Sequence, residues 1–303
     1  MRILLTFAAM VLLIGVTGVA AGNPIDVPQH LVQIESRPGV HTRMLVYRPD
    51  QPLATVILFP DGSGRLDITH VFNTPQIGRS DDLPLELIGH LLHQKISVVL
   101  MDVPSDHRSI LGFNGWHGHR IFRLSPDHVS DISAAVDYLR KEDTLPIWLA
   151  GIRMGGFSAA NAAIHLQQEV AGLVIAGGIT RCPEQKTLLK LCPNGLMGMP
   201  LHQITVPTLI LSDEDAFPEA LLTSALSQSP AVSFQTYPEF ADFETTKAEP
   251  KSPSVLAGLS NDRLSREMTD FMEWNERINP ILDGTPGAVE KAPEEIYLAG
   301  IYF

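Results

Sequence analysis

The feature that most constrains the fold of this chain is a sharp turn between an apolar strand and an alanine-rich helix. Residues 145–150 read as a buried strand, and residues 156–164 read as the beginning of a helix. Between them, Gly151 and Gly155 flank a central Arg153. Small flanking residues suit a strained turn in which the central side chain projects and the backbone packs closely against its neighbours. A strand, such a turn and a helix in direct succession predict one unit of a helix-covered sheet.

Continuous apolar runs recur along the chain and alternate with helix-like stretches. The predicted strands are 41–47, 54–59, 96–101, 146–150, 171–176, 206–211 and 232–237, and the predicted helices are 83–93, 126–141, 154–168, 218–227 and 261–278. Strands that are apolar on both faces are typical of a parallel sheet with helices on both sides. The sequence therefore predicts one α/β domain at 24–278, built on a doubly wound and mainly parallel sheet.

Three segments carry a resemblance to a known superfamily. They are the turn at 151–155, a glycine-rich loop at 59–65 and the segment 101–106, and each follows a predicted strand. In order and spacing they resemble the α/β-hydrolase superfamily, and within it a group of exported bacterial serine-hydrolase-like proteins. The resemblance extends over about residues 38–275 and implies the α/β-hydrolase fold. It also implies that the turn is a nucleophile elbow and that the glycine-rich loop is the oxyanion loop.

The oxyanion loop and the elbow supply the candidate ligand-binding residues. Asp61 stands where related loops often carry a histidine. Backbone amides near Gly62 or Ser63, together with the amide of Met154, would face a developing oxyanion. With Arg153, these residues are the predicted lining of a binding site.

The same resemblance indicates that the catalytic residues are incomplete. Arg153 occupies the nucleophile position, and a guanidinium stays protonated and does not attack a carbonyl. The acid position falls to Asp215, for which a solvated acidic turn is the alternative. The family places its histidine last, yet the last histidine of this chain is His202, and Ala257 lies where the histidine is expected. Two of three triad positions therefore fail, which removes the usual route of proton transfer.

An arginine at the elbow is electrostatically unfavourable by itself, because the N-terminus of a helix is already positive. The position predicts an anionic partner for Arg153. Asp215 and a ligand carboxylate or phosphate are the two candidates. A side chain turned toward solvent is the third alternative.

Other polar residues offer weaker candidates for chemistry. Ser158, five residues past the elbow centre on an alanine-rich helix, reads as a small packing residue. Ser105, Asp106 and His107 lie together after a strand, where α/β sheets bind ligands, but adjacent residues seldom form a triad. The histidines at 117 and 119 lack further ligands at a known spacing. We therefore expect neither a metal nor a cofactor.

The N-terminus has the features of an export signal. A short positive region precedes an apolar run, and small residues before residue 22 suit cleavage, so residues 1–21 read as a signal peptide. An uncleaved membrane anchor is the alternative. The expected location is the periplasm or the exterior, with no other membrane contact. A net charge of −12 argues against a nucleic-acid partner.

The cysteines and the C-terminus complete the predictions. In an exported protein, Cys182 and Cys192 read as a disulfide that pins a lid segment, with two buried thiols as the alternative. Residues 279–303 read as a linker rich in proline, glycine and acidic residues, followed by an apolar tail. The tail either docks on the domain or binds a protein partner.

These features favour an exported protein with a disabled hydrolase site that binds a small, anionic ligand or a partner. Two alternatives stay open. The chain is either an active hydrolase of esters or similar bonds with an unrecognised nucleophile, or a structural component of an envelope complex.

Overall fold

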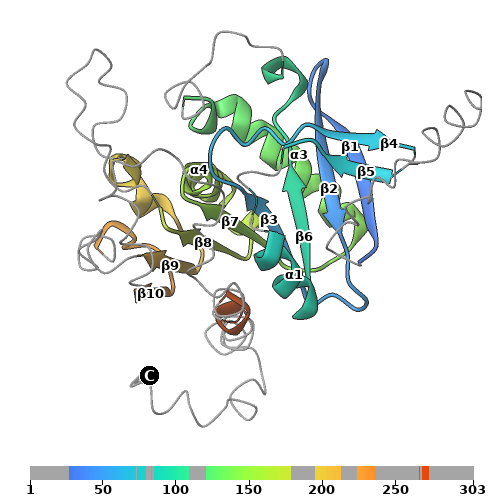
Figure 1. Cartoon of the computed structure of the whole chain (residues 1–303). Helices are drawn as coiled ribbons and strands as arrows, with labels where there is room; N and C mark the ends of the chain where they lie inside the picture. Colours follow the sequence, from blue (N-terminus) through green and yellow to red (C-terminus); the bar gives the residue numbers. More distant parts are fainter. Residues whose placement is uncertain are drawn as a thin grey trace, which may run out of the picture.

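The centre of the molecule is an eight-stranded sheet (Figure 1). The computed structural model describes residues 27–72, 74–79, 83, 85–108, 121–178, 195–212, 224–236, 266 and 268–272. In spatial order the strands are β1 (Gln29–Arg37), β2 (Val40–Tyr47), β6 (Ile96–Met101), β3 (Ala54–Phe59), β7 (Ile147–Ile152), β8 (Gly172–Ala176), β9 (Thr208–Ser212) and β10 (Val232–Thr236). Strand β2 runs antiparallel to β1 and β6, and every other pair in this sheet is parallel. The predicted doubly wound, mainly parallel sheet is thereby confirmed.

Helices cover both faces of the sheet (Figure 1). They are α1 (Leu85–His93), α3 (Pro126–Glu142) and α4 (Gly155–Leu166), with short 3-10 turns η1 (Ser105–His107), η2 (Gln167–Glu169), η3 (Gly195–Gly198) and η4 (Leu201–Gln203). Of the helix predicted at 261–278, the described residues 268–272 are helical. Among the described residues, no helix is long and apolar enough to span a membrane.

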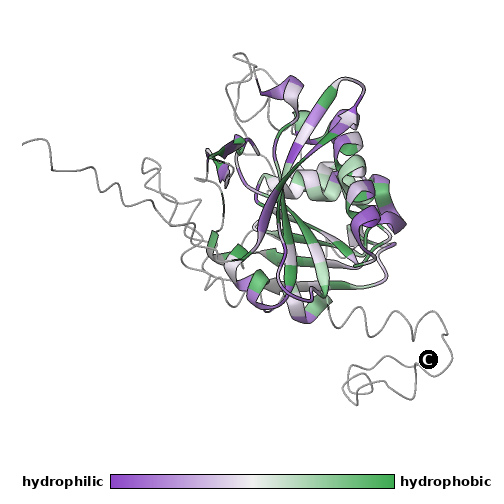
Figure 2. Ribbon diagram, turned by 90° about the vertical axis from the view of Figure 1, so that its right-hand side faces the viewer, coloured by the Kyte–Doolittle hydropathy of each residue, from purple (hydrophilic) through white to green (hydrophobic). Residues whose placement is uncertain are grey.

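Two apolar cores form because successive residues of a strand point to opposite faces. In β3, Ile57 packs in the core beneath α3 and α4, whereas Val56 and Leu58 pack in the core beneath α1. Trp148 lies in the second core and is fully buried. In Figure 2, hydrophobic residues predominate along the central strands of the sheet.

Two elements were not predicted from the sequence. Strand β1 is exposed or half-buried at every position except Val32, so it lacks the continuous apolar run of the inner strands. The hairpin of β4 (Ile68–Val71) and β5 (Thr74–Ile77) consists of short, mostly exposed strands. Both elements lie where one face meets solvent, and there the apolar pattern weakens.

Candidate functional site

The turn between β7 and α4 has a strained backbone. Arg153 adopts a φ of +48°, in the left-handed region that few side chains enter. A Cβ atom at Gly155 would overlap the carbonyl oxygen of Phe59, and one at Gly151 would overlap the carbonyl oxygen of Gly155. The two flanking glycines are therefore required by close backbone packing, and the turn holds residue 153 at the carboxyl end of the sheet.

A carboxylate from the oxyanion loop contacts the elbow directly. Arg153 Nε lies 2.9 Å from Asp61 Oδ2 in an ion pair. The backbone amide of Met154 donates a hydrogen bond of 3.0 Å to Asp61 Oδ1. Both side chains of the pair remain about one-third exposed, at 30% and 29%. One carboxylate thus bridges the guanidinium and the first amide beyond the elbow centre.

The buried side chain of Arg123 donates hydrogen bonds to backbone carbonyl oxygens of the oxyanion loop. Arg123 is buried, with only 2% of its surface exposed. Its Nη2 donates to the carbonyl oxygens of Pro60 at 2.9 Å, Gly62 at 3.2 Å and Asp61 at 3.4 Å. In a trans peptide the carbonyl and the following amide point in opposite directions. The amides of residues 61, 62 and 63 therefore face away from Arg123.

Glycines allow the loop to adopt this shape. Gly62 has a φ of +58° and Gly64 has a φ of +71°, both in the left-handed region. A Cβ at Gly64 would come within 3.0 Å of Arg123 Nη2. Successive amides in such a backbone form a concave surface that favours anions. The carboxylate of Asp61 lies in this same loop and adds a negative charge beside the amides.

Comparison with known proteins decides the fold. No family model matches the chain, and no curated protein matches it in sequence. Its structure is similar to that of α/β hydrolase GrgF from Penicillium sp. sh18, with a TM-score of 0.51, 11% identity and coverage of 82% of this chain and 99% of that one. It is also similar to an esterase of Rhizomucor miehei (TM-score 0.53, 13% identity, coverage 86% and 85%) and to esterase Pf2001 of Pyrococcus furiosus (0.52, 13%, 82% and 92%).

The chain has the α/β-hydrolase fold. At such low identity the likeness establishes architecture alone. Within this α/β-hydrolase fold, β9 ends at Ser212 and β10 ends at Thr236. The predicted acid Asp215 follows the first of these strands, and the predicted histidine position Ala257 follows the second. Both positions lie outside the described residues.

Several other predictions also lie outside the described part of the α/β-hydrolase fold. They concern the signal peptide at 1–21, the histidines at 117 and 119, the cysteines Cys182 and Cys192, and the segment 279–303. Within the described residues, no group of three or more His, Cys, Asp or Glu side chains is arranged to hold a metal ion.

Ser158 is buried, as its position on α4 predicts, but it also makes polar contacts. Its Oγ accepts a 2.7 Å hydrogen bond from Arg123 Nη1 and lies 2.9 Å from His128 Nε2. Burial lowers the pKa of His128 to about 3, and the positive charge of Arg123 adds to this effect. The imidazole is therefore neutral near pH 7. The serine and the histidine are spaced like a nucleophile and its base, but Ser158 is fully buried.

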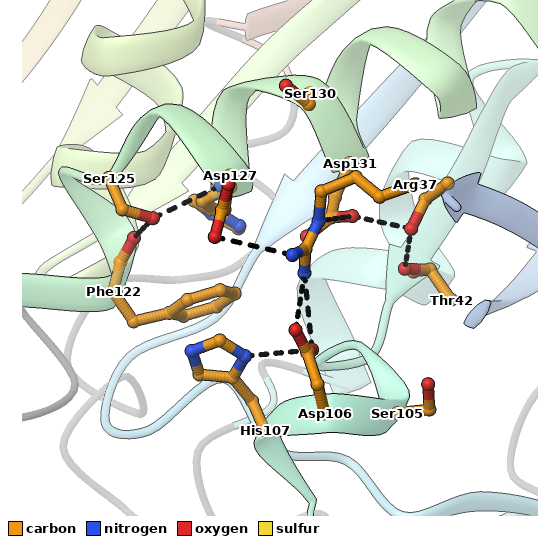
Figure 3. A network of polar contacts seen from close by, with 12 residues as sticks. Arg37, Thr42, Ser105, Asp106, His107, Phe122, Ser125, Asp127, Ser130 and Asp131 are labelled. Atoms are coloured by element: carbon orange, nitrogen blue, oxygen red, sulfur yellow. Dashed lines mark hydrogen bonds and ion pairs between the residues drawn. The ribbon is translucent and has the colours of Figure 1, made fainter. Parts of the chain in front are cut away.

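Arg37 organises a second polar network at the end of β1 (Figure 3). It pairs with Asp131 at 2.9 Å, Asp106 at 3.0 Å and Asp127 at 3.3 Å. The hydrogen bond to Asp131 raises the pKa of Arg37, against the opposing effect of partial burial. Burial raises the pKa of the Asp131 carboxyl, although its bond to Arg37 acts in the opposite direction. The network joins β1, α3 and η1.

The loop cluster at 105–107 does not assemble a triad. Ser105 Oγ accepts a hydrogen bond from the His41 amide, and Figure 3 shows the hydroxyl apart from the imidazole of His107. His107 Nδ1 lies 2.9 Å from Asp106 Oδ1. Partial burial alone would raise the pKa of Asp106, but His107 and Arg37 outweigh it and lower that pKa. The His107 ring packs against Phe122, with centroids 4.1 Å apart.

Proposed function

We propose that this chain is a non-catalytic protein with the α/β-hydrolase fold that binds a small ligand at the elbow and does not cleave it. The observation that carries this proposal is the bridging carboxylate of Asp61. Acyl transfer requires donors that are available where the oxyanion develops. Here the amide of Met154 already donates to Asp61 Oδ1, so a donor that would stabilise the transition state is engaged by the protein itself.

The identity of the elbow residue supports the same conclusion. Arg153 occupies the strained position and is ion-paired with Asp61. The sequence beyond β10, the segment in which the family carries its histidine, contains no histidine at all. His128, which lies behind the oxyanion loop, is buried and neutral. Nucleophile, base and oxyanion donor therefore all depart from what hydrolysis requires.

The remaining parts of the proposal rest on sequence. We assign residues 1–21 to export, which places the protein in the periplasm or outside the cell. In that oxidising setting Cys182 and Cys192 form a disulfide over the site. The apolar end of the chain is proposed as a contact for a protein partner.

The alternative is a hydrolase with a non-standard nucleophile. Ser158 is the candidate, because it is the described serine whose hydroxyl contacts a histidine ring, at 2.9 Å. Its complete burial argues against this role. A substrate would reach Ser158 only if α3 or α4 moved away from the sheet.

Ester hydrolysis and serine labelling test the proposal. The purified wild-type protein is assayed with p-nitrophenyl esters of two to eight carbons, and in parallel with a fluorophosphonate probe. We expect turnover no faster than that of heat-denatured protein, and no covalent label. Turnover that is abolished by Ser158→Ala but kept by Ser130→Ala, an exposed serine on α3, would establish the alternative instead.

A further inference from the structure

We draw no further inference here: the strongest candidate, the tip of the β4–β5 hairpin, where Phe72 is 99% exposed with a φ of +50°, carries none, because nothing in the described part of the structure shows what covers it.

Discussion

Replacement of Asp102 by alanine should strongly destabilise the fold. The Asp102 side chain is fully buried and directly follows β6. Its Oδ1 accepts from the amides of Leu66 at 2.8 Å and Val103 at 2.9 Å, and its Oδ2 accepts from the amide of Ile68 at 3.0 Å. These three residues are themselves buried. The carboxylate therefore ties the segment that follows the oxyanion loop to the edge of the sheet.

The expected magnitude comes mainly from three buried amides that lose their acceptor, together with the Arg108 guanidinium, which donates to Oδ2 at 3.2 Å. Each unsatisfied buried amide costs about 1–3 kcal/mol. Water entering the space left by the carboxylate offsets part of this cost. We expect Asp102→Ala to lower the free energy of unfolding by about 3–6 kcal/mol, a large share of the roughly 5–15 kcal/mol that is typical of a domain. Asp102→Asn keeps one acceptor oxygen but turns an NH2 group toward the Ile68 amide, so it should lose about 2–3 kcal/mol.

Urea unfolding followed by tryptophan fluorescence measures these changes, because Trp148 is fully buried in the native state. Asp137→Ala is the control, since Asp137 is an exposed aspartate on α3. Its effect should stay within about 0.5 kcal/mol. If Asp102→Ala unfolds within 1 kcal/mol of wild type at an unchanged m-value, the argument that the carboxylate supports these amides is refuted.

Three further predictions concern the elbow and its surroundings. Gly155→Ala should lower the free energy of unfolding by more than about 3 kcal/mol or abolish folding, because the new Cβ overlaps the Phe59 carbonyl, which is backbone and does not rotate away. The yield of soluble protein and urea melts measure this effect. Arg153→Ser should give no ester turnover above wild type in the p-nitrophenyl assay, because it supplies neither a base nor a free oxyanion donor; full esterase activity in this variant would contradict the loss of the histidine. The pKa of His128 falls to about 3 on folding, so the unfolded chain binds a proton more readily than the folded chain does. The free energy of unfolding should therefore decline as the pH is lowered from about 6.5 toward 3, by up to about 4 kcal/mol in total. His128→Gln should show a flatter acid branch in pH-dependent melts, and an unchanged branch would mean that the imidazole is not the group responsible.

The fold was predictable because the inner strands carry the signal at every position. Strands β3, β6, β7 and β8 are buried throughout, so each reads as an uninterrupted apolar run. The outer strand β1 and the β4–β5 hairpin are half-exposed, and their alternation is too weak to stand out. The prediction therefore succeeded for the buried strands and missed β1, β4 and β5, in which exposed positions interrupt the apolar pattern.

The strained turn between β7 and α4 was predictable from its flanking glycines, but the side-chain pairing of Arg153 was not. Asp61 was assigned a role through nearby amides, and its carboxylate was overlooked as a partner for Arg153. The signal was present, because β3 and β7 are parallel neighbours and their carboxyl-end loops must meet. Two opposite charges at the centres of those loops indicate a contact. Arg123 gave no such signal, since a buried arginine bound to the carbonyl oxygens of residues 60–62 has no local sequence pattern.

Arg153 at the elbow and Asp61 in the loop after β3 pair with each other, and under the proposed function both oppose hydrolysis. Arg153 places a positive charge at the positive end of α4, and the carboxylate of Asp61, 2.9 Å from its Nε, offsets that charge. Asp61 alone would place a carboxylate where a hydrolase develops an oxyanion, and two unit charges about 4 Å apart repel by about 4 kcal/mol at an effective dielectric constant of 20. That repulsion corresponds to a rate penalty of roughly a thousandfold. Restoring a serine at 153 and a histidine at 257 would therefore leave Asp61 opposing the transition state. Under the proposed function, the absence of hydrolysis therefore has two sources, the arginine at the nucleophile position and the carboxylate of Asp61 that pairs with it.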